Sequence, residues 1–175
     1  MLVLETKRLA LSHLSADDAP FIVRLLNDPD WIRFIGDRKI RTVDAALRYL
    51  REGPIAMYAR EGFGLYRAAL SDTGEPIGLC GLIRRPGLDA VDLGFAFLPA
   101  HRGKGYALES ATGVVEHARK LGLDRLVAIA SPDNVRSACL LTSLGFGEPE
   151  PFRLPGSDED LHLFAMDLGT RSDPA

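Results

Sequence analysis

The chain has 175 residues, of which 46% are hydrophobic and 26% are charged, and its formal net charge is −3. This length suits one domain, and the composition excludes a disordered, collagen-like or coiled-coil chain. Lys and Arg form no long run, which disfavours a nucleic-acid-binding protein, because such a protein needs a basic face for the phosphate backbone. We expect a single domain over residues 4–168, with frayed residues 1–5 before it and a polar tail, residues 169–175, after it.

The first residues and the cysteines bear on the compartment and on metal binding. Met1-Leu-Val-Leu is followed at once by charged residues, so no signal peptide is expected, and no apolar run is long enough to span a membrane. We therefore predict a cytoplasmic protein that does not act at membranes. Cys80 and Cys139 lie in apolar stretches and lack the spacing of metal ligands, so both are expected to be buried free thiols, and no metal is expected.

The first third of the chain is predicted to contain one short strand and two helices. Leu9 and Leu11 alternate with their neighbours, as in a strand. A helix over residues 15–27 begins at a capping serine, and Asp residues follow in its first turn. A second helix over residues 43–52 is expected to end at Gly53-Pro54, because proline disrupts a helix interior.

From residue 63 onwards the hydrophobic pattern changes to a period of two, which predicts an antiparallel meander of three strands. A helix, a buried strand, a second helix and a final hairpin follow. The expected ranges are 63–70, 76–83 and 91–98 for the meander, 107–121 for the helix, 126–130 for the strand, 134–144 for the second helix, and 151–154 with 161–168 for the hairpin. Strand, helix and strand in this order favour a right-handed parallel crossover, so the predicted class is α/β with a mixed sheet.

The segment over residues 99–107, between a strand and a helix, is the most informative part of the sequence. It contains Gly103 and Gly105 together with Arg102 and Lys104. A helix start offers unpaired N–H groups and a partial positive charge, and glycine lets the backbone approach an anion closely, so the segment is suited to bind phosphate. It matches neither a P-loop nor the dinucleotide fingerprint. The alternative is a glycine-rich turn with two solvated cations.

These residues resemble the GNAT superfamily of acetyl-CoA-dependent N-acetyltransferases. Its pyrophosphate loop, Arg/Gln-x-x-Gly-x-Gly/Ala, is matched by Arg102, Gly105 and Ala107. A second element, an Asn-x-x-Ser/Ala helix that ends in Gly-Phe, is matched by residues 134–137 and 144–146. Two separate motifs at the correct spacing carry much more weight than either one alone.

The resemblance covers about residues 4–168 and extends to one branch of the superfamily. The opening Leu4-Glu-Thr-Lys-Arg-Leu9, the pair Asp17-Asp18 and the run Gly105-Tyr-Ala-Leu-Glu109 are similar to the branch that includes the ribosomal-protein N-terminal acetyltransferases. It implies a GNAT-like α/β fold: a mixed, mostly antiparallel sheet, a central parallel strand pair splayed around the cofactor, and helices on both faces.

The resemblance also implies how acetyl-CoA would be bound. The pantetheine arm is expected in the wedge between the strand over residues 91–98 and the strand near Leu126, where the cofactor would satisfy free backbone groups. A backbone N–H within residues 94–97 is expected to polarise the thioester carbonyl. The expected cofactor-binding residues are Phe95, Ala96, Phe97, Leu98, Arg102, Gly103, Lys104, Gly105, Tyr106, Ala107, Asn134 and Ser137.

The sequence departs from the family where many members place a tyrosine that protonates the leaving thiolate. That position holds Leu141, and Ser137 is the nearest polar substitute. A thiol of pKa about 8.5 can leave as thiolate near neutral pH at modest cost, so the loss is tolerable. Cys139 is expected to pack in the core. Asp92 and Glu109 flank the wedge and are the candidate proton acceptors, the alternative for each being a solvated or salt-bridged carboxylate.

The acceptor is expected to contact the first part of the chain. Trp31 and Phe34, within residues 27–38, offer aromatic contact area, although helix packing explains them equally well. The acidic turn at residues 154–160 could attract a cationic amine, or could simply be solvated. An α-amine is roughly 14% neutral at pH 7, against about 0.04% for lysine, so a site without a strong base suits an α-amine or another weakly basic amine. The histidines, expected to be structural or surface residues, are His13, His101, His117 and His162.

The sequence thus predicts an N-acetyltransferase that transfers the acetyl group of acetyl-CoA to a primary amine by direct attack in a ternary complex. The amine would be a small molecule or a peptide or protein N-terminus. The alternative is a non-catalytic acyl-CoA-binding sensor that kept the cofactor loop and lost the chemistry along with the tyrosine. A homodimer is compatible with such a fold.

Overall fold

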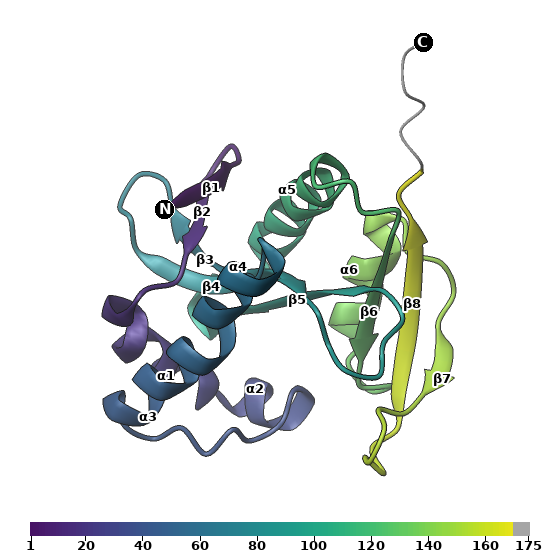
Figure 1. Ribbon diagram of the computed structural model, residues 1–175, viewed down its shortest axis with the longest axis horizontal. Helices are drawn as coiled ribbons and strands as arrows, with labels where there is room; N and C mark the ends of the chain where they lie inside the picture. The colour runs from purple at the N-terminus through teal and green to yellow at the C-terminus, as the bar shows by residue number, and fades with distance from the viewer. Residues whose placement is uncertain (170–175) are drawn as a thin grey trace.

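The computed structural model describes residues 1–169, which form a mixed sheet of eight strands with helices on both faces (Figure 1). The expected tail therefore lies, from residue 170 onwards, outside the described residues. The strand order is β1-β2-β3-β4-β5-β6-β8-β7, and the β5–β6 pair is parallel while the other neighbours are antiparallel. The strands are β1 (Leu2–Glu5), β2 (Leu9–His13), β3 (Leu65–Leu70), β4 (Pro76–Ile83), β5 (Val91–Phe97), β6 (Arg125–Ala130), β7 (Glu150–Phe152) and β8 (Leu161–Asp167).

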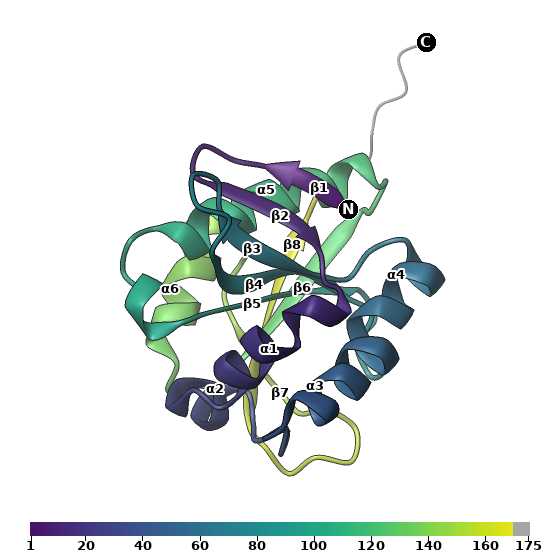
Figure 2. The same ribbon diagram turned by 90° about the vertical axis from the view of Figure 1, so that its left-hand side faces the viewer.

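Two hydrophobic clusters fix the helices to the sheet. The first four helices pack on one face of β3–β5, and α5 and α6 pack on the opposite face (Figures 1 and 2). The helices are α1 (Ala19–Leu26), α2 (Pro29–Phe34), α3 (Val43–Leu50), α4 (Ala56–Glu61), α5 (Tyr106–Lys120) and α6 (Val135–Leu144), with short helical turns at Ala16–Asp18 and Pro99–His101. The face under α1–α4 is called the acceptor face below, and the face under α5 and α6 the cofactor face.

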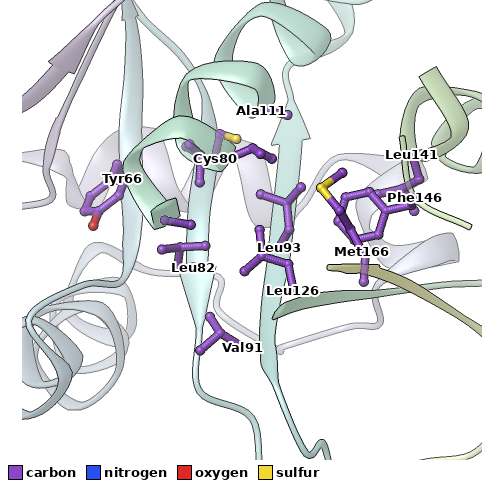
Figure 3. Packing of buried hydrophobic residues seen from close by; sticks show 14 of the residues in the cluster. Tyr66, Cys80, Leu82, Val91, Leu93, Ala111, Leu126, Leu141, Phe146 and Met166 are labelled. Atoms are coloured by element: carbon purple, nitrogen blue, oxygen red, sulfur yellow. The ribbon is translucent and has the colours of Figure 1, made fainter. Parts of the chain in front are cut away.

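The alternation of side chains along β5 assigns its residues to the two faces. Val91 and Leu93 are buried with Ala111 of α5 on the cofactor face, as Figure 3 shows. Ala96 and Leu98, which have the opposite parity, pack with α1 and α3 on the acceptor face. Because successive residues of a strand point to opposite faces, Asp92 and Gly94 also lie on the acceptor face.

The pairing of β5 with β6 stops soon after it begins. The register joins Val91 to Leu126 and Asp92 to Val127 and goes no further, and Figure 1 shows the two strands turning away from each other beyond these pairs. The other side of β5 stays paired with β4 along its whole length. The expected fold class, with a splayed parallel pair in a mostly antiparallel sheet, is thus confirmed.

Two local predictions were wrong. Leu2–Glu5 are not frayed, because they form β1 and pair with β2. The helix that begins at Val43 does not end at Gly53-Pro54. It passes through a wider π-helical turn at Arg51–Ile55 and continues as α4 to Gly62, whose φ of +77° ends it. A π-helical turn shifts the hydrogen-bond register, so the missing N–H of Pro54 does not end the helix.

The two cysteines differ in exposure, and the described residues contain neither a membrane-spanning helix nor a metal cluster. Cys80 is buried as expected, but Cys139 is exposed on α6, which corrects the prediction for that residue. Among residues 1–169, no helix combines the length and the apolar character that a membrane crossing requires. Within the same residues no group of three or more His, Cys, Asp or Glu side chains is placed to hold a metal ion.

Candidate functional site

A cleft of about 1000 Å³ lies where β5 and β6 separate. It reaches from the start of α5 and the start of α6 to the acceptor-face helices α2, α3 and α4 and to the β7–β8 loop. The cleft brings together most of the residues that the sequence singled out. Those that line it are Asp92, Phe95, Ala96, Phe97, Arg102, Gly103, Gly105, Tyr106, Ala107, Asn134 and Ser137.

The open edge of β5 presents unpaired backbone groups to the cleft. Leu98 N–H donates to Ile77 O at 2.9 Å, which places this pair in the hydrogen-bonded register with β4. Because antiparallel pairs alternate, the N–H and C=O groups of Leu93 and Phe95 then point away from β4, towards the position that β6 has vacated. A ligand with peptide-like amides could satisfy these groups, which are costly when buried unpaired.

The loop before α5 forms the positive end of the cleft. Gly103 and Gly105 adopt φ values of +71° and +82°, which side chains rarely tolerate, and Gly105 is the N-cap of α5. From outside the cleft, Arg8 steadies this loop: its Nη1 donates to Lys104 O at 3.0 Å, and its guanidinium lies 4.5 Å from the centre of the Tyr106 ring. The loop is thus held open around the unpaired N–H groups of a 15-residue helix.

The start of α6 forms the opposite wall. Asn134 is its N-cap, and the side-chain oxygen accepts the Ser137 N–H at 3.2 Å. The Ser137 hydroxyl is partly buried and lines the cleft, and the exposed Cys139 lines it as well. Leu141 packs in the cofactor-face core with 1% of its surface exposed. The position at which many family members have a tyrosine is therefore apolar and buried.

Three of the expected residues are used differently. Leu98 is outside the cleft lining: its N–H is bonded to β4, and its side chain is buried on the acceptor face. Lys104 is also outside the lining. The Arg102 side chain lines the cleft but is occupied by protein groups, since it donates to Phe97 O and to the carboxylates of Asp28 and Asp30.

Asp92 is the buried carboxylate of the site, with 2% of its surface exposed. Its Oδ2 accepts Arg85 Nε at 3.0 Å and lies 2.9 Å from Arg85 Nη2, while Oδ1 has no hydrogen-bond partner among the described residues. Burial raises the pKa of Asp92 above its ordinary value, and the Arg85 guanidinium and the Ile129 backbone N–H oppose this shift. Oδ1 is thus a buried oxygen without a close hydrogen-bond partner, on the acceptor face of β5.

Glu109 lies outside the cleft, against the β1–β2 turn. Its Oε1 accepts the Thr6 hydroxyl at 2.6 Å and the Arg8 N–H at 2.7 Å, and its Oε2 accepts Arg8 Nε at 2.6 Å. Partial burial raises its pKa, but these hydrogen bonds outweigh that effect and lower the pKa below the ordinary value. A carboxylate so engaged is a poor proton acceptor, so the geometry gives Glu109 a structural role.

The acceptor side of the cleft contains residues that the sequence analysis missed. These are Tyr49 of α3, Met57 of α4 and Arg85. Trp31, Phe34 and Arg38, which also line it, belong to the expected segment 27–38. Glu159 of the acidic turn lines it as well. The apolar spacing continues after Pro54 through Met57, which could have indicated that the helix carries on.

Comparison with known proteins agrees with this geometry. The family model described as the acetyltransferase (GNAT) domain matches residues 8–147. The chain belongs to the GNAT acetyltransferase family. It is accordingly an acetyl-CoA-dependent N-acetyltransferase of the GNAT fold, as the loop and the Asn-x-x-Ser helix predicted.

Relatives and solved structures cover nearly the whole chain. An uncharacterized N-acetyltransferase, p20, from Bacillus licheniformis is 28% identical over 174 residues, 95% of this chain and 96% of its own. The uncharacterized N-acetyltransferase YoaA of Bacillus subtilis is 28% identical over 147 residues, 82% of each chain. An acetyltransferase structure from Agrobacterium tumefaciens is 27% identical, with a TM-score of 0.79, and covers 95% of this chain and 94% of its own. RimL, a ribosomal L7/L12 alpha-N-protein acetyltransferase in complex with coenzyme A, has a TM-score of 0.81 at 16% identity, with 95% and 98% covered.

Proposed function

We propose that this GNAT enzyme binds acetyl-CoA in the wedge between β5 and β6 and transfers the acetyl group to a weakly basic primary amine that enters from the acceptor face. The main support is the open edge of β5, whose unpaired backbone groups lead to the positive start of α5. This arrangement fits a ligand with an amide-containing arm and a pyrophosphate.

The residues present fit acetyl-CoA. Leu93 and Phe95 would pair with the amides of the pantetheine arm, and the loop with Gly103 and Gly105 would hold the pyrophosphate on its N–H groups. Asn134 and Ser137 would contact the cofactor from the other wall. When bound, acetyl-CoA supplies an acetyl group activated as a thioester. An N–H of β5 that faces the gap would polarise the thioester carbonyl, a contribution typically worth about 3 kcal/mol.

Asp92 is the residue best placed to accept the proton of the amine. Its Oδ1 is free, it lies on the acceptor face, and burial raises its pKa towards the range in which a carboxylate is an effective base. Arg85 holds the other oxygen and so fixes the orientation of the carboxylate. Ser137 is a hydrogen-bond donor near the leaving thiol. In this proposal a neutral amine attacks the thioester directly, within the ternary complex.

The acceptor class follows from the fraction of each kind of amine that is neutral at pH 7. An α-amine is roughly 14% neutral at pH 7 and needs little help, whereas a lysine amine is only about 0.04% neutral. The name of RimL assigns it an α-amine on a protein, which is compatible with this class. We therefore propose a peptide or protein N-terminus, or a small amine of similar basicity, as the acceptor.

Release of free thiol from acetyl-CoA, measured across N-terminal peptides, aminoglycosides, polyamines and amino acids, tests the proposal. Amine-dependent release with α-amino compounds is expected. High turnover on lysine side chains with none on α-amines would overturn the acceptor class. Tight CoA binding with no amine-dependent release on any compound would favour the non-catalytic sensor instead.

A further inference from the structure

Arg102 was expected to bind phosphate, but its guanidinium is turned to the acceptor side. Its Nε donates to Phe97 O and its Nη1 to Asp30 Oδ2, both at 2.8 Å, and its Nη2 donates to Asp28 Oδ1. All three nitrogens therefore have protein partners, and two carboxylates balance the single positive charge. The side chain has little capacity left for an anionic ligand.

The two carboxylates belong to the start of α2, more than 70 residues earlier in the chain. Asp28 is the N-cap of α2 and accepts the Trp31 N–H at 3.3 Å, and only 5% of its side chain is exposed. Asp30 lies in the first turn of the same helix. Arg102 thus joins the loop that precedes α5 to the first turn of α2.

The helix α2 is also joined to the other wall of the wedge. Arg136 of α6 donates to Asp30 at 2.8 Å, and Arg33 of α2 donates to Asp133, which lies just before α6, also at 2.8 Å. These contacts place α2 across the gap between the end of β5 and the end of β6. Trp31 and Phe34 of α2 line the cleft from this position.

The ion pairs that hold α2 differ in how much of their side chains is exposed to solvent. The side chains of Arg33 and Asp133 are 64% and 57% exposed, and exposed pairs contribute little. Arg102 and Asp28 are only 25% and 5% exposed, so loss of either one leaves a buried charge without its partner. Among the ion pairs that hold α2, the Arg102–Asp28 pair is therefore the one whose loss is expected to cost most.

We propose that Arg102 is a positioning residue for the acceptor: by holding Asp28 and Asp30 it fixes α2, and with it Trp31 and Phe34, over the cleft beside the thioester. This rests on the proposed function, because it assumes that the acceptor uses this side of the cleft. Arg102 thereby couples the cofactor loop to acceptor binding, and the pyrophosphate is left to the backbone N–H groups of the loop.

The test compares three variants. Arg102→Gln keeps side-chain N–H donors but removes the charge, and Asp28→Asn keeps a good N-cap but removes the other half of the pair. Each is expected to raise the KM for the amine about tenfold, to change kcat less, and to alter the CoA dissociation constant by less than about threefold. Gly103→Ala, which strains the loop at a φ of +71°, is expected to do the reverse, weakening CoA binding while the amine KM stays unchanged.

Trp31 gives a second readout, since it is the one tryptophan in the sequence. The wavelength of its fluorescence emission, measured without any ligand, should shift in Arg102→Gln and Asp28→Asn. Trp31 directly follows Asp30 in the sequence, and its N–H is bonded to Asp28. The matched control is Arg119→Gln, which removes the same charge from an exposed pair with Glu116 near the end of α5. Its emission should equal that of the unaltered protein. Arg102→Lys keeps the charge but loses the forked geometry of the guanidinium. Its Trp31 emission should therefore lie between that of Arg102→Gln and that of the unaltered protein.

The outcomes separate the two proposals. Weaker CoA binding in Arg102→Gln, with a loss as large as in Gly103→Ala and with unchanged amine KM and Trp31 emission, would make Arg102 a phosphate ligand and overturn the positioning role. If the unaltered enzyme releases no thiol with any amine, the proposed function fails. The Trp31 emission still decides whether Arg102 holds α2.

Discussion

The two sides of the cleft are built on different principles. The side proposed for the cofactor is built mainly from backbone groups of residues 91–107: an open strand edge, two glycines with positive φ and a helix start. Asn134 and Ser137 add side chains to it. The acceptor side consists of side chains from α2, α3, α4, the β4–β5 loop and the β7–β8 loop. A site built from backbone groups leaves short local motifs in the sequence, whereas a site built from side chains is dispersed along the chain.

The largest effect is expected where the backbone site is filled. Gly105→Glu places bulk and negative charge at the N-cap of α5, so we expect the CoA dissociation constant to rise at least about 100-fold, or about 2.7 kcal/mol. Gly122→Glu is the matched control, because Gly122 has a similar φ of +78° at the other end of α5 and open space around it. Calorimetric titration with CoA measures both. Equal CoA affinities of Gly105→Glu and Gly122→Glu would mean that the loop before α5 does not bind the cofactor.

Asp92→Asn tests whether Asp92, which lies between the two sides of the cleft, accepts the proton of the amine. The amide keeps the shape but cannot accept the proton, so we expect kcat to fall about 100-fold with CoA affinity retained. The deficit should shrink as the pH rises towards the pKa of the amine, because solvent then removes the proton. The rate profiles of both proteins between pH 6 and 10 check this. A constant ratio at all pH values would assign Asp92 a structural role.

Glu109→Gln tests the expectation that this residue is a base against the structural role that its contacts indicate. We expect the free energy of unfolding to fall by about 1–2 kcal/mol at pH 7, because hydrogen bonds to the carboxylate are lost, with kcat changed less than about threefold. The pKa of Glu109 is lowered, so its contribution is present above the ordinary value of 4.5 and is lost as the pH falls through the lowered pKa. Denaturant unfolding at pH 7 and in the acid range measures this. A large loss of kcat without destabilisation would restore Glu109 as the base.

The smallest effect is expected from His13 of β2 and His117 of α5. His13 stacks on Tyr58 with ring centres 3.9 Å apart, and His117 Nε2 lies 3.2 Å from the Tyr66 hydroxyl. Burial lowers the pKa of both histidines, so the folded protein resists protonation, and stability should decline as the pH falls below 6.5. Since about 1 kcal/mol shifts Tm by about 2–4 °C in a domain of this size, we expect only a few degrees between pH 7 and 5.5. The fall in Tm between pH 7 and 5.5 should be smaller in His117→Gln than in the unaltered protein. Thermal unfolding of both proteins at the two pH values measures this difference.

The glycine-rich loop before α5 and the start of α6 could be predicted from the sequence because their signals are local. Glycines at a strand-to-helix junction and a capping asparagine followed by serine act through the backbone around them. The acceptor half could not be predicted in the same way. Arg85, Tyr49 and Met57 carry no motif, and Arg102 matched the phosphate pattern although its side chain is bound by Asp28 and Asp30.

The sequence by itself determined the family, the mixed sheet and the position of the glycine-rich loop before α5, because strand periodicity, glycine conformation and helix capping depend on neighbouring residues. Only the tertiary structure decided which charges are free. It paired Glu109 with Arg8, it left one oxygen of Asp92 unpartnered, and it joined Arg102 to α2. The physical reason is that the state of a carboxylate or a guanidinium depends on burial and on partners that lie tens of residues away in the chain.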